Sequence, residues 1–172
     1  MFKIIVLIEP YNSAYPDMFQ TKSQAIQKAL GTNCITVHHI GSTSVPYLAA
    51  KPIIDILPVV KDIRIVDQHT LSMNNLGYEA KGEHGIPFRR FFKKEGFNVH
   101  AFEVASPEIS KHLLFAQFLM KHPEICTQYE QLKFNLAKQF PNDITSYCLG
   151  KDTFIREIFK NAFNKLIKAS FY

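Results

Sequence analysis

The period of the hydrophobic pattern changes once along this chain, and that change constrains the fold more than any other feature. Before residue 106, apolar residues form short β-branched runs of strand length, at residues 4–8, 36–40 and 53–60. From Ser106 onward they recur every three or four residues, as in helices that bury one face. The sequence therefore predicts an α+β fold, in which a mixed β-sheet is flanked by helices and the C-terminal third is helical.

Local start and stop signals predict the remaining elements. They are helices after residue 15 and over residues 63–76, a hairpin of residues 87–93 and 97–104, and C-terminal helices after Ser106, after Pro123 and after a break at residues 141–143. The chain has 172 residues, of which 47% are hydrophobic and 20% charged. At this length folding buries about 70% of the unfolded surface. Because the sequence shows no repeat or linker, we expect a single domain over residues 1–172.

Cysteine usage and the N-terminal sequence indicate a cytoplasmic protein. Cys34, Cys126 and Cys148 are odd in number and widely spaced, which favours reduced thiols over a disulfide framework. Two of them stand four residues from a histidine, but further zinc ligands at close spacing are absent or remote, so buried structural cysteines are favoured. The apolar run at residues 4–8 is too short for a signal peptide. We therefore expect a cytoplasmic protein with no membrane partner.

The excess of positive charge lies in the second half of the chain. The formal net charge is +5. Residues 1–80 hold six Lys/Arg and six Asp/Glu, whereas residues 81–172 hold fourteen and nine. A basic half suits an anionic partner such as a nucleotide, a coenzyme or RNA, although many proteins of this charge bind nothing acidic.

A turn of glycine and hydroxyl residues follows the run at residues 36–40. Gly41, Ser42, Thr43 and Ser44 would expose backbone N–H groups and hydroxyls, which can hold phosphate oxygens. An ordinary polar turn would have the same composition. Of the two histidines before the turn, His39 is the nearer and the better candidate for a site.

Asp55 stands within the apolar run at residues 53–60. Because burying an unpaired carboxylate costs free energy, we expect a metal, a cation or hydrogen-bond donors beside it. A pair with Lys51 is the structural alternative. A functional role is favoured, because acids seldom interrupt buried strands.

The predicted hairpin could complete a site around Asp55. His100 and Glu103 are three residues apart, so a strand directs them to opposite faces and at most one joins Asp55. Arg89 and Arg90 alternate in the same way, so one of them is covered and needs an anion such as a triphosphate or Asp55. A solvated strand edge is the alternative for the two arginines.

Other polar residues are interpreted as structural or solvated. Lys111 and His112 fall in the first turn of a helix, whose dipole disfavours positive charge there, so we expect a structural role unless that helix end faces the cleft. Lys133, Lys138 and Lys151 are expected on a solvated basic face.

Several motifs together resemble the GrpB family over nearly the whole chain. They are Tyr11 with Tyr15-Pro16, residues 39–46, residues 48–56, Gly85-Ile86-Pro87 with Arg89-Arg90, Ser106-Pro107-Glu108 with His112-Leu113, and Tyr147 with Gly150-Lys151 and Phe154-Ile155. GrpB proteins are grouped with the nucleotidyltransferase superfamily, so the resemblance implies a nucleotidyltransferase-like sheet with a phosphate-gripping turn. Some relatives are fused to dephospho-CoA kinase, which gave the family the name dephospho-CoA kinase/protein folding accessory domain. Gly150-Lys151 lacks the upstream glycine of a P-loop, so this chain is not itself a P-loop kinase.

Two departures limit what the resemblance implies about catalysis. Active nucleotidyltransferases carry two acids one residue apart, because two Mg²⁺ ions bridge the reacting oxygens. The neighbours of Asp55 at that spacing are Ile53 and Leu57. Family members often show two histidines where this chain has Asn98 and His100.

The leading hypothesis is a protein that binds a nucleotide or nucleotide-containing coenzyme with one Mg²⁺ or Mn²⁺. If it is catalytic, it would transfer a nucleoside monophosphate to a small-molecule acceptor. The assigned residues are Gly41, Ser42, Thr43, Ser44, Lys51, Arg89 and Arg90 for phosphates, Asp55 and Glu103 for the metal, and Asp55 and His100 for catalysis. The alternatives are a non-catalytic accessory module that lacks the acid pair and, more weakly, an RNA-binding protein, whose affinity would fall steeply with salt.

Overall fold

The computed structural model describes residues 5–169, with side chains described to residue 161, and its central feature is a five-stranded sheet of order β1-β2-β5-β4-β3. The strands are β1 Cys34–Ile40, β2 Ile54–Val60, β3 Glu79–Ala80, β4 Arg90–Lys94 and β5 Phe97–Glu103. β2 is antiparallel to β1 and parallel to β5, so the sheet is mixed, as predicted. In this register Asp55 pairs with Ile40 on one side and Asn98 on the other.

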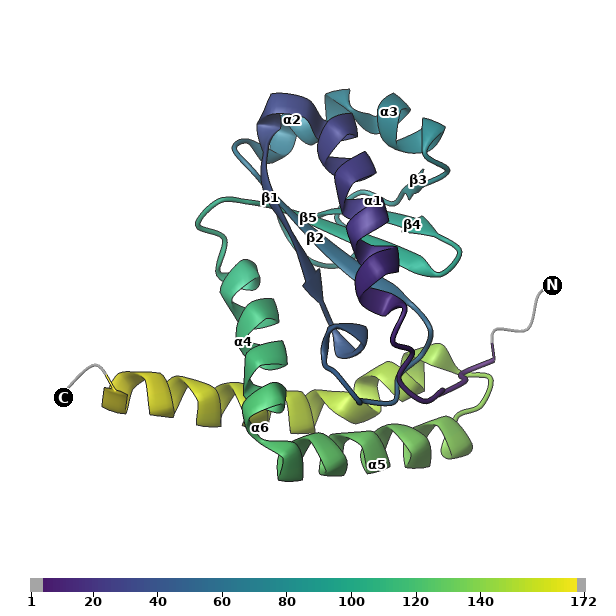
Figure 1. The fold of residues 1–172 in the computed structure, drawn as a ribbon, viewed down its shortest axis with the longest axis vertical. Helices are drawn as coiled ribbons and strands as arrows, with labels where there is room; N and C mark the ends of the chain where they lie inside the picture. The colour runs from purple at the N-terminus through teal and green to yellow at the C-terminus, as the bar shows by residue number, and fades with distance from the viewer. Residues whose placement is uncertain (1–4, 170–172) are drawn as a thin grey trace.

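The two faces of the sheet are covered by different helices. They are α1 Tyr15–Leu30, α2 Ile63–Gln68 and α3 Thr70–Asn75 on one side, and α4 Pro107–Lys121 on the other (Figure 1). Because strand side chains alternate, Ile54 and Ile56 pack with α1 residues, whereas Leu57 packs toward α4. Asp55 has the same parity as Leu57 and so lies in the row of β2 that faces α4.

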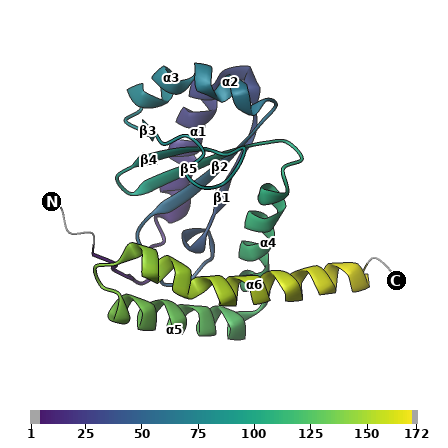
Figure 2. The same ribbon diagram turned by 180° about the vertical axis from the view of Figure 1, so that it is seen from behind.

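The C-terminal helices form a layer below one end of the sheet. α5 Pro123–Gln139 and α6 Ile144–Ala169 lie side by side there in both views (Figures 1 and 2). Val45 and Leu48, just after the turn that leaves β1, pack into the core that these helices share with α4. The turn is a short 3-10 helix, Ser42–Ser44. The α+β class and the helical C-terminal third are therefore confirmed.

Several element boundaries differ from the sequence prediction. Residues 5–8 do not form a strand, although Val6 and Ile8 are buried against C-terminal helices, and Ile4 lies outside the described residues. The backbone N–H of Val6 donates to Pro141 of the α5–α6 loop, so this segment is held by the helical layer instead of the sheet. The predicted helix at residues 63–76 is two helices that meet at His69.

The hairpin is also shorter at its start than predicted. It begins at Arg90 instead of residue 87, because Phe88 takes a positive φ of 62° that interrupts the extended backbone. Its turn is Glu95-Gly96. Among the described residues, no helix is both long and apolar enough to cross a membrane. The prediction of one domain over residues 1–172 stays a prediction.

Candidate functional site

Asp55 of β2 lies beside polar side chains of β5 and the turn that follows β1. Its side chain is 27% exposed. The Oδ1 atom accepts hydrogen bonds from Asn98 Nδ2 at 3.0 Å and His100 Nε2 at 3.1 Å. Burial alone would raise the pKa of the Asp55 carboxyl, but the bonds from His100 and Asn98 and the charge of Lys51 hold it below its usual value. Asp55 is therefore a carboxylate at neutral pH.

Gly41 allows the turn to approach this carboxylate closely. Its backbone has φ 72° and ψ −170°, a conformation that is essentially restricted to glycine. A Cβ atom at this position would lie 2.6 Å from Asp55 Oδ2. The Ser44 hydroxyl donates to the Gly41 carbonyl at 2.6 Å and closes the turn. The predicted turn thus packs directly on the predicted acid.

His39 contacts the turn through Thr43, and its ring is neutral. Its Nε2 lies 3.0 Å from Thr43 Oγ1, and the Thr43 hydroxyl donates to the Ile53 carbonyl at 3.3 Å. The ring stacks on Phe19 with centroids 4.8 Å apart. Burial lowers the pKa of His39 to about 4, against the opposing charge of Asp55. Both His39 and Thr43 therefore stabilise the conformation of the turn.

Three lysines line a cavity of about 190 Å³ together with Ser42 and Asp55. Lys51 comes from the segment before β2, Lys133 from α5 and Lys151 from α6. The ammonium groups of Lys51 and Lys151 lie 5.4 and 4.4 Å from the centre of the Tyr147 ring. An aromatic face attracts cations without neutralising them, so the cavity keeps an excess of positive charge.

Lys133 is buried, so the prediction that it lies on a solvated basic face was wrong. Its side chain is 2% exposed, and Nζ donates to the Ala49 carbonyl. Glu130, one turn earlier on α5, accepts a hydrogen bond from Ala49 N–H at 2.7 Å. Burial, helped by the charge of Lys151, lowers the pKa of Lys133 to about 7. Lys151 is half-buried, which lowers its pKa, so of the predicted face only Lys138 is exposed.

A larger cavity of about 530 Å³ adjoins the first and shares Ser42, Asp55 and Lys151 with it. Phe115 of α4 and Phe159 of α6 contribute apolar walls. The start of α4 faces this cavity through Lys111 and His112, the exception that the sequence analysis allowed for. Burial and the nearby His100 lower the pKa of His112 to about 4, so its ring is neutral. The two cavities form one cleft, which we call the Asp55 cleft.

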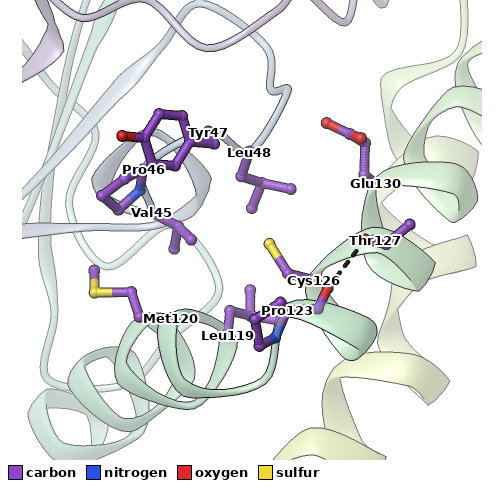
Figure 3. Close-up of a pocket in the computed structure, with 10 residues that line it drawn as sticks. All are labelled: Val45, Pro46, Tyr47, Leu48, Leu119, Met120, Pro123, Cys126, Thr127 and Glu130. Carbon is purple, nitrogen blue, oxygen red and sulfur yellow. Dashed lines mark hydrogen bonds between the residues drawn. The ribbon is translucent and has the colours of Figure 1, made fainter.

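A third cavity, of about 420 Å³, shares no lining residue with the Asp55 cleft. Val45 and Leu48 face the α4–α5 corner there, and Cys126 points toward them (Figure 3). Tyr47, at its edge, is 90% exposed and has a φ of 66°. Its walls are mainly apolar, with Glu130 as the charged residue among them.

The remaining predicted residues do not line the Asp55 cleft. Arg90 pairs with Asp67 of α2, with Nε 2.6 Å from Oδ1. Glu103 accepts a hydrogen bond from the Ile63 N–H at the start of α2. It pairs with Val60, five positions along β2 from Asp55, a separation of about 16 Å at 3.3 Å per residue. Arg89 is buried behind His100 and contacts Asp55 only through that ring.

Sequence reasoning missed the contributions of the helical layer. Lys133, Tyr147 and Lys151 line the small cavity. Tyr147 and Lys151 fall in a family-like motif, which was the available signal. Lys133 carried no such signal, because a lysine within an amphipathic helix ordinarily faces solvent.

A divalent cation in the small cavity would find a single carboxylate, Asp55, whereas Glu108 and Asp152 line the larger cavity. Among the described residues, no group of three or more His, Cys, Asp or Glu side chains could hold a metal ion. Mg²⁺ nevertheless binds proteins through one or two carboxylates, with phosphates and water as its other ligands. Asp55 Oδ2 takes part in neither bond made by Oδ1, so the site fits a cation that arrives with a phosphate ligand.

Comparison with known proteins gives close relatives over most of the chain. The family described as GrpB protein matches residues 5–161. The UPF0157 protein YqkA of Bacillus subtilis is 42% identical over 156 residues, which are 88% of this chain and 46% of YqkA, so the chain spans about half of that relative. A crystal structure of the conserved protein GrpB from Enterococcus faecalis has a TM-score of 0.88 at 40% identity, and the match covers 93% of this chain and 99% of that one.

More distant structures have the nucleotidyltransferase fold. Terminal uridylyl transferase 4 from Trypanosoma brucei, with bound UTP, has a TM-score of 0.51 at 13% identity, and the match covers 91% of this chain and 52% of that one. At this identity the likeness shows the fold alone. The nucleotidyltransferase-like sheet that the sequence resemblance implied is therefore confirmed.

Proposed function

The chain belongs to the GrpB family, and we propose that it binds a nucleotide or nucleotide-containing coenzyme through its phosphate groups in the Asp55 cleft. The observation that carries this proposal is the cluster of Lys51, Lys133 and Lys151 around one small cavity that also contains Ser42. Three lysines around a cavity that holds only one carboxylate, Asp55, favour an anionic ligand. The distant likeness to a uridylyl transferase with bound UTP makes nucleoside triphosphates the first ligands to test.

A divalent cation would bind between Asp55 and the phosphates. Asp55 is ionised, because its hydrogen bonds to Asn98 and His100 keep its pKa low. In the small cavity, one carboxylate and three lysines attract a free cation poorly, so we expect Mg²⁺ or Mn²⁺ to bind together with the nucleotide. When bound, the cation would neutralise phosphate charge. Asp55 would orient it, and Lys51 and Lys151 would contact phosphate oxygens.

Nucleotide transfer is a separate question from binding. In such a transfer the oxygen of an acceptor hydroxyl attacks the α-phosphorus and gives up its proton to a base or to water. The bond from the α-phosphorus to the α,β-bridging oxygen breaks, and pyrophosphate leaves. The second acid that two-metal chemistry uses is absent, because Leu57 occupies its place and is fully buried. This favours the second candidate function, a non-catalytic binding or accessory module that keeps the fold.

Calorimetric titration tests the proposed binding. ATP, GTP, CTP, UTP and CoA are titrated into the wild type with and without Mn²⁺, and the ligand that binds is then titrated into variants. Asp55→Asn should abolish the dependence on metal. Lys151→Gln should weaken binding by about 10- to 100-fold, as expected for loss of a charge-assisted hydrogen bond of about 1.5–3 kcal/mol. Lys138→Gln, on the exposed side of α5, is the matched control and should change nothing.

Two results would contradict the proposal. One is the absence of binding for every ligand in the panel, and the other is binding that Asp55→Asn and Lys151→Gln leave unchanged. RNA binding at a basic surface would instead show a steep loss of affinity with added salt. Release of pyrophosphate from the bound triphosphate, lost in Asp55→Asn, would separate transfer from simple binding.

A further inference from the structure

Arg89 is a buried arginine whose hydrogen bonds point inward. Its exposed fraction is 5%. Nε donates to the Glu83 carbonyl at 3.1 Å, Nη2 to the His84 carbonyl at 2.6 Å, and Nη1 lies 3.2 Å from His100 Nδ1. The guanidinium also lies over the Phe91 ring, 4.8 Å from its centre. It is therefore held on several sides and lines neither part of the Asp55 cleft.

These contacts determine the tautomer of His100. A guanidinium only donates hydrogen bonds, so His100 Nδ1 must accept from Arg89 and carries no proton. The ring proton is then on Nε2, which is 3.1 Å from Asp55 Oδ1 and donates to it. With the opposite tautomer, Nδ1–H would face the guanidinium and the Nε2 lone pair would face the carboxylate. Both contacts would then be repulsive.

We propose that Arg89 is a positioning residue, which fixes the tautomer of His100 and thereby orients the Asp55 carboxylate for its ligand. A chain of hydrogen bonds thus runs from Arg89 through His100 to Asp55. Outer partners of this kind fix the ring orientation of a histidine and its proton. Asn98 holds the same oxygen of Asp55, which leaves Oδ2 beside Gly41.

The same guanidinium connects a loop to the carboxylate. Residues 82–88 run between β3 and β4, and His84 and Phe88 in this loop have positive φ values of 46° and 62°. Arg89 holds the carbonyls of Glu83 and His84, while Ile86 of the loop lines the large cavity. A wall of the cleft and the carboxylate inside it are therefore positioned by one side chain.

The proton position can be measured in the free protein. Nitrogen-15 NMR of the histidine rings, assigned with His100→Gln, should show a proton on Nε2 of His100 and none on Nδ1. In Arg89→Met the Nδ1 signal should move toward that of a protonated nitrogen, because the guanidinium that keeps a proton off Nδ1 is gone while Asp55 still faces Nε2. Arg90→Met is the matched control, because the side chain of this neighbouring arginine pairs with Asp67 instead of His100. A proton on Nδ1 in the wild type, or an unchanged signal in folded Arg89→Met, would overturn the proposal.

A second readout rests on the proposed function. Metal-dependent nucleotide affinity should fall by about 10- to 100-fold in Arg89→Met and stay unchanged in Arg90→Met, the range typical for loss of an outer partner. If Arg89→Met does not fold, Arg89→Lys takes its place, since it keeps the charge but cannot reproduce the fork. Unchanged affinity in a folded Arg89 variant would contradict the proposed role. A wild type that binds no nucleotide would contradict the proposed function alone, since the tautomer measurement needs no ligand.

Discussion

At the residue scale, Asp55 and Gly41 depend on each other. The acid was predicted to need donors, and Asn98 and His100 supply them. The turn was predicted to hold phosphate oxygens, and the group that its glycine approaches in the structure is the Asp55 carboxylate. The sequence pattern along each strand could indicate the acid and the turn separately. It could not indicate their contact, which depends on the pairing of Ile40 with Asp55 across the sheet.

Gly41→Ala should lower both stability and nucleotide affinity. The new Cβ would lie 2.6 Å from Asp55 Oδ2 in addition to its unfavourable φ of 72°. Gly85→Ala is the control, because Gly85 also has a positive φ, 85°, but no atom lies within 4 Å of an added Cβ. We expect urea unfolding to show a loss of about 1–2 kcal/mol for Gly85→Ala and more for Gly41→Ala. Equal losses, with affinity unchanged in both, would count against close packing on Asp55.

Lys133 should give the protein a measurable pH dependence. Its pKa of about 7 in the folded state lies below its value of about 10.4 in the unfolded chain, so between them the unfolded state binds more protons. Stability therefore rises with pH in this window, by at most about 1.4 kcal/mol per pH unit, and this contribution is constant below it. Lys151, Glu130 and Cys126 face the same amine and contribute to its pKa.

The measurement compares free energies of unfolding for wild type and Lys133→Met from pH 6 to pH 10. The value for Lys133→Met minus that for wild type should decrease as pH rises. For Lys138→Met, the exposed control on the same helix, the difference should stay constant. A constant difference for Lys133→Met as well would mean that the buried amine titrates normally.

At the element scale, the amphipathic helices and buried strands formed where the hydrophobic period of the sequence predicted them, whereas short segments did not. Residues 5–8 alternate buried Val6 and Ile8 with exposed Ile5 and Leu7, as a strand would, yet their backbone contacts the α5–α6 loop. Whether an extended segment finds a strand partner depends on distant parts of the chain. The prediction that Lys133 is solvated was wrong for the same reason, because the Ala49 carbonyl, distant in sequence, lies against α5 and accepts a hydrogen bond from its ammonium group.

Glu103 lies toward the opposite end of the β2–β5 ladder from Asp55, so its substitution tests whether it belongs to the metal site. Its carboxylate supports the start of α2 through Ile63 N–H, about 16 Å along the ladder from Asp55 at 3.3 Å per residue. Glu103→Ala should therefore cost about 1 kcal/mol in the free energy of unfolding and leave metal-dependent binding unchanged. Glu95→Ala, in the exposed hairpin turn, should change neither. Loss of metal-dependent binding in Glu103→Ala, comparable with that in Asp55→Asn, would place Glu103 in the site.

At the scale of the whole molecule, the cleft lies between the sheet and the helical layer. Ser42 and Asp55 come from the sheet side, and Lys133 and Lys151 from the helices. Composition indicated only that the second half is basic. The packing of α5 and α6 below the end of β1 determines where that charge is concentrated (Figure 2).

A ligand that joins the two layers should stabilise the whole fold. At a free concentration one hundred times its Kd, a nucleotide with Mn²⁺ should raise the free energy of unfolding by about 2.7 kcal/mol. For a chain of this size that corresponds to an increase in Tm of about 5–10 °C. Differential scanning calorimetry measures it, and Asp55→Asn under the same conditions should show little increase. An equal increase in Asp55→Asn would locate the binding elsewhere.

The central claim is that this cleft holds phosphate groups and a cation, and a crystal structure with a non-hydrolysable nucleoside triphosphate and Mn²⁺ tests it most directly. The account predicts anomalous density for Mn²⁺ about 2.1 Å from an oxygen of Asp55. It also predicts phosphate oxygens within hydrogen-bonding distance of Lys51 and Lys151. Triphosphate bound outside the cleft, or bound within it with no cation at Asp55, would contradict the account.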